Sequence, residues 1–547
     1  MFIQDLKTEF YELLLNDRVL VLCGGDVDAL ASCKILQYLF QCDNILYTLV
    51  SVTRRQEIVD AIDKHGETGK YVVLLNCGAT FDVIDECKPK NEQLVFFIAD
   101  AHRPFSVYNV YNNAQVRILS RLEEDNVPSF DDLFRDDMDS DDEDDGSGRD
   151  FEATVERRRQ KRLWVENRNR LLFEYMQFNY FGKPTALLMF ELCWKMSRDS
   201  TEILWYAVLG LSDQLAHRRL ESDQYVTECG LLQGHMSRYD QLYDQNSGES
   251  TVNSVKLSFG RELNLAFLRH WTLLESMRHT VHVACRFRMW TVKGQKKLHE
   301  FMAELGVPLS ECRQKFASMD ITIRNSVKDW IFKLADKYAL DEIDFGCFTG
   351  NLGYKHRFLA IDVVNAVHTL LDEGDFFRAL DALSWSRIEI LEKGIELSKT
   401  KLTSIFQQVQ TFLETRQVVS TGSYLYAVLQ ESTPNSKTFG RPGALEELGY
   451  FLQAAYVSTS RTRKSPTLPM VVAAPSSMAD YQGYSLVVGI PPLAETSSRN
   501  LFAQVFAQAA AQCEAGTIKT AYLQENFVLV KSEHSQKFFE TIFDLLC

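Results

Sequence analysis

The sequence predicts an α/β protein with a parallel sheet near the N-terminus, an all-helical insertion and linker region, and a smaller α/β unit near the C-terminus. Three observations indicate this class. Apolar β-branched runs alternate with helical periodicity over residues 1–120, helical periodicity dominates 263–412, and apolar runs return after residue 420. Because single cores stop growing near roughly 250–300 residues, a chain of 547 residues is expected to contain several domains.

The net charge of −15 is concentrated in one segment. Residues 123–150 contain 14 acidic residues against Arg135 and Arg149, a net charge of −12, which leaves −3 of the −15 for the rest of the chain. A nearly balanced remainder excludes nucleic-acid binding by bulk positive charge, but it leaves open a local basic groove.

Cysteine spacing and the N-terminal residues indicate an intracellular protein. The 12 cysteines lie at least nine positions apart, so no CxxC pair for zinc or redox chemistry is present. The first 14 residues carry charges where a signal peptide has an apolar centre, and no apolar run is long enough to span a bilayer. We therefore expect reduced, buried thiols and no membrane segment.

The first strand-to-helix turn carries two carboxylates. Residues 19–23 read as a buried strand, Gly24 and Gly25 interrupt it, and helical spacing follows. Asp26 and Asp28 lie on the turn, where paired carboxylates can hold a cation or one aspartate can cap the helix. From this turn alone, capping is the favoured interpretation.

Two further predicted strands also end in polar turns. The run 71–75 leads into Asn76, and the run 94–99 leads into Asp100 and His102. The carboxyl ends of parallel strands meet at one edge of a sheet, where ligands bind in open α/β folds. These side chains are therefore expected to meet those of the first turn at a functional site.

Residues 123–152 form an acidic block that is predicted to be a disordered loop. Its like charges and few aromatic residues give it too little apolar surface to order itself. A solvated spacer is the favoured role, with a tether for a basic partner or phosphorylation at Ser140 and Ser147 as alternatives. The basic cluster 157–162 is typical of nuclear import signals, or of the exposed face of a helix over 153–175.

The middle of the chain is predicted to be helical. Two helices are expected before residue 211, and Asp213 follows as another acidic residue at the end of an element. His279, His282 and Cys285 are zinc-ligand types at one-turn spacing, but no second cluster completes four ligands, so no zinc site is predicted there. Residues 240–255 are expected to be a linker or loop, with helices at 296–305, 310–319, 323–338, 357–371 and 388–413.

The C-terminal part returns to alternating strands and helices. Residues 461–464, with the sequence RTRK, are expected to form an exposed basic loop. Strands are expected at 424–429, 469–474, 485–490 and 526–531, and helices at 443–456 and 498–513.

The polar turns occur in the order of the four motifs of the DHH phosphoesterases, which include the RecJ single-strand exonucleases. The matching positions are Asp26, Asp28, Asn76, residues 100–104 and residues 210–213. A closer resemblance covers essentially the whole chain, and it is to the cell division control protein 45 family. It rests on the segments FQCDNILYTLV, DAHRPFSVYNVYN, GVPLSECRQKFASMD, GYKHRFLAIDVV and VVGIPP.

The resemblance implies five regions along the chain. They are a DHH-like α/β core (1–122), the acidic loop (123–152), a helical completion of the core (153–245), a helical partner-interaction and linker region (246–413), and a DHHA1-like α/β domain (414–547).

The resemblance also implies which residues are relics of an enzyme site. Active DHH enzymes hold two divalent ions that activate water. Asp26, Asp28, Asp100, His102 and Asp213 match the positions of their ligands.

Two ligand positions differ from the active pattern. Asn76 replaces an aspartate, Ala101 replaces the first histidine of the DHH motif, and Arg103 stands where active enzymes commonly have an acidic residue. Losing even a group that only orients a ligand typically weakens metal binding ~10–100-fold. We therefore expect no catalytic residue, no bound metal and no other cofactor, with Asp100 paired to Arg103 instead.

The loop that contacts nucleic acid in RecJ-type enzymes is also changed. At the matching position, Val488 and Gly489 are followed by Ile490, Pro491 and Pro492. Prolines lack the amide donors that a phosphate-binding loop needs, so phosphate binding by this loop is not expected.

By resemblance, the function is that of a non-catalytic subunit and activator of the eukaryotic replicative DNA helicase, in the nucleus. The implied partners are the minichromosome-maintenance hexamer, the GINS complex, other replication-initiation factors and the DNA polymerase machinery, with no membrane. The middle region would carry the partner surface. Trp271, Trp290 and Trp330 are candidate anchors, although core packing is the favoured role of each.

Two alternative functions stay open. An active metal-dependent single-strand DNA exonuclease or phosphoesterase of RecJ type would have to bypass Asn76 and Ala101. A protein that holds single-stranded DNA without cleaving it would need a basic groove, for which Arg54, Arg55 and Arg103 are candidate contacts.

Overall fold

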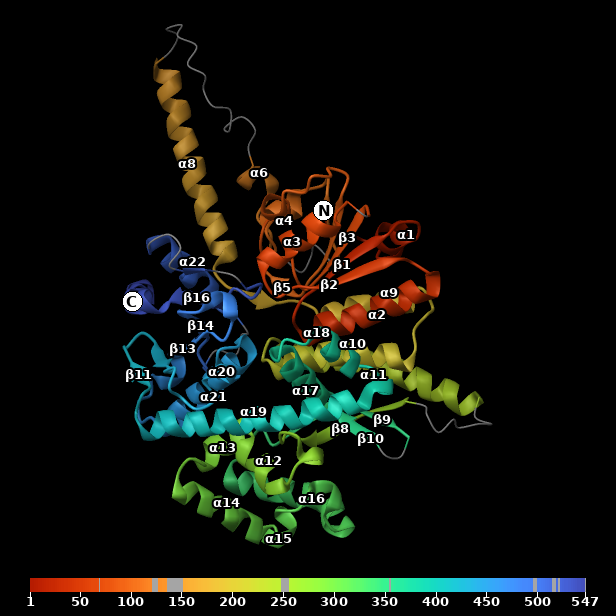
Figure 1. The fold of residues 1–547 in the computed structure, drawn as a ribbon, viewed down its shortest axis with the longest axis vertical. Coiled ribbons are helices and arrows are strands. Elements are labelled where there is room, and N and C mark those ends of the chain that lie inside the picture. Colours follow the sequence, from red (N-terminus) through yellow and green to blue (C-terminus); the bar gives the residue numbers. More distant parts are fainter. Residues whose placement is uncertain are drawn as a thin grey trace.

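The computed structural model describes residues 1–67, 69–120, 126–134, 151–246, 255–353, 356–494, 499–513, 518–519 and 522–546. Figure 1 shows the N-terminal sheet and the C-terminal α/β unit on the same side of the long helix α19 (Ile388–Glu414). A group of shorter helices lies on the opposite side of α19, and α8 (Phe151–Met176) projects away from the body of the molecule.

Five parallel strands form the N-terminal sheet, in the order β2-β1-β3-β4-β6. The chain leaves β1 toward one edge to form β2 and then returns to form β3 on the other side of β1. The carboxyl ends of β1 and β3 therefore flank a topological switch point, which is where ligands bind in open α/β sheets. The strands are β1 Val19–Cys23, β2 Tyr47–Ser51, β3 Tyr71–Leu75, β4 Val95–Ala99 and β6 Val116–Ile118.

Helix α2 begins directly after β1 and is buried on almost every side. It contacts the sheet through β1 and β3, and it also contacts α9 and α10, so it lies at the centre of the largest hydrophobic core. The short strands β5 (His102–Arg103) and β7 (Tyr180–Phe181) pair beside the sheet. The helices of this part are α1 Glu12–Leu14, α2 Val27–Asp43, α3 Arg55–His65, α4 Val83–Cys87, α5 Val107–Tyr111, α6 Phe130–Leu133, α9 Thr185–Lys195, α10 Thr201–Ala216 and α11 Ser222–Asn246.

The region expected to be all helical is mainly helical but also contains a three-stranded antiparallel sheet, which corrects that expectation. Strand β8 (Val255–Leu263) pairs with β9 (Asp344–Leu352), and β10 (His356–Leu359) follows. The pairing spans the whole helical group between β8 and β9, so no local pattern reveals it. The helices are α12 Leu273–His279, α13 Val281–Phe287, α14 Val292–Glu304, α15 Leu309–Cys312, α16 Ile321–Tyr338, α17 Ala360–Asp372 and α18 Phe376–Ala382.

The C-terminal unit contains a six-stranded mixed sheet, in the order β11-β12-β13-β14-β16-β15. Only the β12–β13 pair of this sheet is parallel. Its strands are β11 Val419–Ser420, β12 Leu425–Val428, β13 Met470–Pro475, β14 Tyr484–Ile490, β15 Ile518–Lys519 and β16 Phe527–Lys531. Its helices are α20 Ser436–Phe439, α21 Pro442–Thr459, α22 Phe502–Gln512 and α23 Ser535–Leu546.

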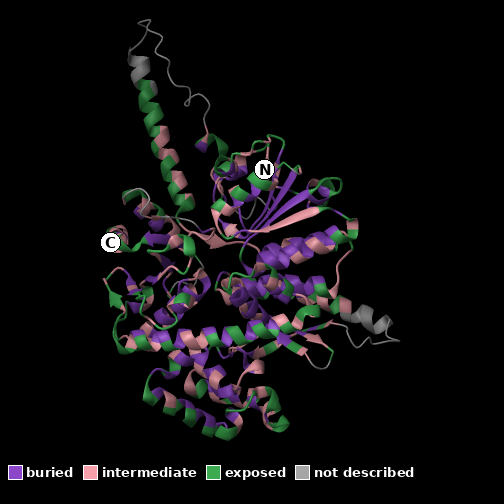
Figure 2. Cartoon of the chain, in the orientation of Figure 1, coloured by how far each residue is buried: buried purple, intermediate pink, exposed green. Residues whose placement is uncertain are grey.

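Buried residues run through the strands and the central helices (Figure 2). One core joins the α12–α16 group to α19 and to one face of the C-terminal sheet, so these parts share their hydrophobic stabilisation. Trp290 is buried in that core, and Trp271 and Trp330 pack against cores. Core packing, the favoured interpretation of these three residues, is therefore observed.

Several predicted boundaries change. Helix α10 continues to Ala216, so Asp213 lies inside the helix rather than beyond its end. The helix expected at 310–319 is reduced to α15 and a short 3-10 turn, and the one expected at 357–371 begins after strand β10. In the segments 310–319 and 357–371, one continuous sequence pattern spans two separate elements, so the pattern alone predicts a single helix.

Part of the acidic block is ordered, which corrects the expectation of a wholly disordered loop. Helix α6 places Phe130 and Phe134 against Tyr111, with ring centroids 5.3 and 5.7 Å apart. These aromatic contacts offset the conformational entropy that the segment loses on ordering, a cost that its like charges do nothing to offset. Residues 121–125 and 135–150 lie outside the described residues, as do Ser140 and Ser147.

The basic cluster lies on a helix, as one of its two interpretations predicts. Arg158, Arg159, Lys161 and Arg162 are exposed on α8. The basic segment 461–464 is also exposed and lies outside any helix or strand. Within the part of the chain that is described, no helix has both the length and the apolarity needed to cross a membrane.

Candidate functional site

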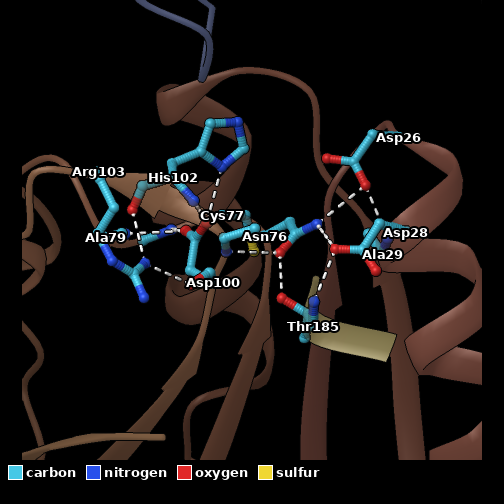
Figure 3. A network of polar contacts seen from close by, with 12 residues as sticks. Asp26, Asp28, Ala29, Asn76, Cys77, Ala79, Asp100, His102, Arg103 and Thr185 are labelled. Atoms are coloured by element: carbon cyan, nitrogen blue, oxygen red, sulfur yellow. Dashed lines mark hydrogen bonds and ion pairs between the residues drawn. The ribbon is translucent and has the colours of Figure 1, made fainter. Parts of the chain in front are cut away.

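The three polar turns meet at the carboxyl ends of β1, β3 and β4 (Figure 3). Asp26, Asn76 and Asp100 follow these adjacent strands, and each is at least 96% buried. The convergence that the sequence predicts is therefore observed. Neighbouring strands, rather than proximity in the chain, bring the three side chains together.

Asp26 caps helix α2, as the favoured interpretation of its turn predicts. Its Oδ1 accepts a hydrogen bond from the backbone N–H of Ala29 at 2.7 Å. The same oxygen also accepts from Nδ2 of Asn76 at 3.0 Å. Burial raises the pKa of Asp26, and the nearby carboxylate of Asp213 raises it further.

The Asn76 side chain lies at the centre of the network. Its Nδ2 donates to Asp26 and, at 2.9 Å, to Oδ2 of Asp28. Its Oδ1 accepts from the backbone N–H of Ala101 at 3.1 Å and from the hydroxyl of Thr185 at 2.5 Å. Both donors and both acceptor positions of the amide are thus satisfied, which fixes its orientation. Turning the amide over would set its donors against the Ala101 N–H.

Asp28 accepts two further hydrogen bonds at the start of α9. Its carboxylate receives the backbone N–H groups of Thr185 at 2.8 Å and Ala186 at 2.9 Å. The positive end of a helix favours an anion at this position. Burial nevertheless raises the pKa of Asp28 to about 7, with a smaller contribution from Asp26. Helix α10 must approach closely, because a Cβ at Gly210 would lie 2.5 Å from Oδ1 of Asp28.

Asp100 pairs with a histidine. Its Oδ2 accepts from the backbone N–H groups of Gly78 and Ala79, both at 3.0 Å. Its Oδ1 lies 2.7 Å from Nδ1 of His102. Burial opposes both charges, but the pairing and its hydrogen bonds outweigh burial, lowering the pKa of Asp100 and raising that of His102.

The expected pairing of Asp100 with Arg103 is replaced by another contact. Nη1 of Arg103 donates to the backbone carbonyl of Asp100 at 2.8 Å, and the guanidinium lies 3.9 Å from the ring centroid of Phe105. Arg103 belongs to β5 and is drawn over Phe105, whereas the Asp100 carboxylate points toward His102. A cationic residue three positions along the chain is therefore a poor guide to side-chain pairing.

The other two candidate DNA contacts join the N-terminal and C-terminal units. Arg55 lies 2.6 Å from Oε1 of Glu525, and Arg54 contacts Glu57 at 2.7 Å and Asp480 at 3.5 Å. These arginines are partly neutralised by protein carboxylates. Their role in binding DNA stays a prediction.

Asp213 lies close to the network but faces a different set of partners. Its carboxylate is 3.1 Å from Nδ1 of His217 and 3.5 Å from Nη1 of Arg219. Burial alone would raise the pKa of Asp213, and the two cations outweigh it and hold the pKa below its usual value. Sequence reasoning missed both cations, because no motif links them to the strand ends.

Two cavities open beside these residues. One, of about 840 Å³, lies between the N-terminal and C-terminal units and is lined by His102, Arg219 and the prolines of the VVGIPP segment. The other, of about 460 Å³, is lined by Asp26, Asn76 and His102. Gly489 of the VVGIPP segment packs against Phe502, since a Cβ there would lie 2.1 Å from that ring. The absence of a side chain at Gly489 thus allows the Phe502 ring to pack against β14.

A family model described as CDC45 matches residues 19–153, 120–375 and 372–544. The chain belongs to the CDC45 family. It is 39% identical to the cell division control protein 45 homolog of mouse and 38% identical to that of human, in each case over 569 residues and 100% of both chains. The crystal structure of CDC45 from Entamoeba histolytica superposes with a TM-score of 0.71 at 20% identity, covering 99% of each chain.

Family membership and fold class thus agree with the sequence prediction. The resemblance to DHH enzymes raises the question of whether the CDC45 site fits two divalent ions. The geometry argues against it: Asn76 turns an N–H donor toward both carboxylates, and an amide nitrogen is not a ligand for hard cations.

Thr185 is a site residue that sequence reasoning missed. Its backbone and hydroxyl contact Asp28 and Asn76, which lie 157 and 109 positions earlier in the chain. The local signal was a helix start, since Pro184 directly precedes α9. That signal predicts the N-terminus of a helix but not the residues it faces.

Proposed function

We propose that this chain is a non-catalytic subunit and activator of the eukaryotic replicative DNA helicase and acts in the nucleus. The proposed partners are the minichromosome-maintenance hexamer, the GINS complex, other replication-initiation factors and the DNA polymerase machinery. Membership of the CDC45 family supports a role in DNA replication.

The observation that carries the non-catalytic part of the proposal is the Asn76 amide. In a two-metal site, cations balance the charge of clustered carboxylates. Here the Nδ2 donors of Asn76 and the N-terminus of α9 hydrogen-bond the carboxylate oxygens of Asp26 and Asp28 that a cation would need. The carboxylates are thus retained as structural acceptors that join β1, β3 and α9.

A nuclease assay separates this proposal from the rival exonuclease. The purified chain, its Asp28→Ala variant and an Asn76→Asp/Ala101→His double variant are incubated with Mn²⁺ and end-labelled single-stranded DNA. We expect no digestion by the unmodified chain. Digestion that is lost in Asp28→Ala would overturn the non-catalytic proposal, and digestion gained only by the double variant would assign the loss of activity to those two positions.

An exposed apolar surface supports partner binding by the middle region. Val292, Leu309 and Ile321 begin α14, α15 and α16 and are 71%, 41% and 60% exposed. All three side chains belong to one group of helices, and we propose that they contribute to the partner surface. We call these three residues the apolar helix starts.

The partner proposal is tested with purified minichromosome-maintenance hexamer and GINS. A variant with aspartate at all three apolar helix starts should lose at least tenfold in affinity, while Val226→Asp, at an equally exposed valine on α11, should not. Circular dichroism checks that both variants fold. Unchanged assembly of the triple variant would remove the middle region from the proposed interface.

A further inference from the structure

Three ligand-type side chains from distant segments meet outside the DHH-like motifs. His217 directly follows α10, His368 lies on α17 and Glu447 lies on α21. One ligand atom of each lies within 4.8 Å of the other two. The two imidazole rings have centroids 4.5 Å apart, and Nδ1 of His368 lies 3.8 Å from Oε1 of Glu447.

A carboxylate stands behind the first histidine. Nδ1 of His217 lies 3.1 Å from Oδ1 of Asp213 and 3.0 Å from the backbone carbonyl oxygen of the same residue. Metal-binding histidines commonly donate their second ring N–H to such a group, which orients the ring and fixes its tautomer. In the neutral ring, a proton held on Nδ1 leaves Nε2 with a lone pair for a metal ion.

The second histidine carries an unexplained buried nitrogen. His368 is 8% exposed, and its Nδ1 has no hydrogen-bond partner among the residues that the structure describes. Most buried polar atoms are paired, so an unpaired one facing other ligand-type groups needs an explanation. The unpaired Nδ1 of His368 lies 3.8 Å from Oε1 of Glu447, so a metal ion between them would give both atoms a partner.

Charged side chains surround the three ligand-type groups. Lys401 contacts Glu447 at 2.7 Å and Asp372 at 3.5 Å, and Arg219 contacts Asp213 at 3.5 Å. Three carboxylates therefore face Lys401, Arg219 and His217, and a metal ion would displace the second ring proton of His217.

We propose that His217, His368 and Glu447 bind one zinc ion. Two imidazoles and one carboxylate form a known type of zinc ligand set, with a fourth position for water. Zinc bonds of about 2.0–2.1 Å separate tetrahedral ligand atoms by about 3.3 Å, so the three side chains close in from their present spacing of up to 4.8 Å. Binding joins α10, α17 and α21, and its effect is to stabilise their packing.

The test uses Co²⁺ as a spectroscopic substitute for zinc. The full-length chain is freed of metal by a chelator and dialysed, then titrated with Co²⁺ and next with Zn²⁺. We expect one equivalent of Co²⁺ with the visible absorption of tetrahedral coordination, displaced by Zn²⁺. Saturating Zn²⁺ should raise the apparent Tm by about 3–5 °C, because it binds the folded state.

Five variants assign the site. His368→Gln and Glu447→Gln should each weaken binding at least tenfold, whereas His282→Gln, at a partly buried histidine of the 840 Å³ cavity, should leave it unchanged. Lys401→Met should bind zinc more tightly, because it removes the competing ammonium group. Asp28→Asn should also leave binding unchanged.

The outcomes are decisive even if one variant fails to fold, which circular dichroism would reveal. Stoichiometric binding that is lost in either the His368 or the Glu447 variant and kept in the His282 variant supports the proposal. Absence of binding by the unmodified chain, or binding abolished by Asp28→Asn but not by His368→Gln, overturns it. Failure here leaves the proposed replication role untouched, because that role requires no metal.

Discussion

Nδ2 of Asn76 donates to Oδ2 of Asp28 across 2.9 Å, and so links the ends of two neighbouring parallel strands. The same nitrogen also lies 3.0 Å from Oδ1 of Asp26. One amide therefore donates to two buried carboxylates. The first prediction follows from these two contacts.

Asn76→Asp should lower the free energy of unfolding by about 3–5 kcal/mol in the presence of a chelator, because it adds an uncompensated buried carboxylate. Urea-induced unfolding at pH 7.5 measures the change. Mn²⁺ should restore part of the loss. Asn112→Asp is the control, because aspartate keeps a side-chain oxygen that can accept the backbone N–H groups of Ala114 and Gln115. Equal stability of Asn76→Asp and the unmodified chain in chelator would contradict this account.

Gly210→Ala should destabilise the fold by about 1–3 kcal/mol. The added methyl group would lie 2.5 Å from Oδ1 of Asp28 and 2.5 Å from Cβ of Ala186, so α10 would have to move away from α2 and α9. Gly230→Ala on α11 has open space around it, and it should be neutral or stabilise by about 0.5–1 kcal/mol. Thermal unfolding of both variants measures the contrast, and a stable Gly210→Ala chain would show that this contact is adaptable.

Asp362→Asn should stabilise the chain above pH 7. Burial raises the pKa of Asp362 to about 7, and the backbone N–H of Phe267 donates to Oδ1 at 3.3 Å. When folding raises the pKa of a carboxyl group, ionisation of that group destabilises the folded state relative to the unfolded state. Its destabilising effect is therefore absent near pH 4 and complete above about pH 7.

The expected gain from Asp362→Asn is roughly 2–4 kcal/mol at pH 8 and close to zero at pH 4. Chemical unfolding across this pH range checks it. Asp336→Asn, at an exposed position on α16, is the matched control and should show no such profile. A gain that is independent of pH would attribute the effect to packing rather than to ionisation.

Arg55 and Glu525 should be energetically coupled. They lie 2.6 Å apart across the boundary between the N-terminal and C-terminal units, and Asn179 also donates to Glu525 at 3.0 Å. A double-mutant cycle of Arg55→Met and Glu525→Gln should give about 0.5–1 kcal/mol, falling in high salt because both side chains are partly exposed. A coupling energy near zero would indicate that other contacts hold the units together.

Local patterns predicted much of the fold. The apolar run before Gly24 predicts β1, and the spacing after Asp28 predicts α2, because strands and helices differ in the period of their buried residues. The same patterns failed for β8 and β9. Their pairing depends on residues that are distant in the chain, and a long helical group between them hides the sheet.

For the candidate site, too, sequence patterns predicted some features and missed others. The positions of Asp26, Asn76 and Asp100 at the ends of adjacent parallel strands could be predicted, because parallel topology brings carboxyl ends to one edge. The hydrogen-bond partners could not. Arg103 seemed the natural partner of Asp100, yet the side chain that faces the carboxylate belongs to His102.

The sequence alone determined the strand ends of the N-terminal sheet, a helix cap at Asp26 or Asp28 and, through long matching segments, the family. Only the tertiary structure decided that Thr185 completes the network around Asn76, and that His217, His368 and Glu447 meet. The physical reason is range: strand and helix periodicity is set by neighbours within a few residues. Contacts between side chains more than a hundred positions apart depend on how complete elements pack.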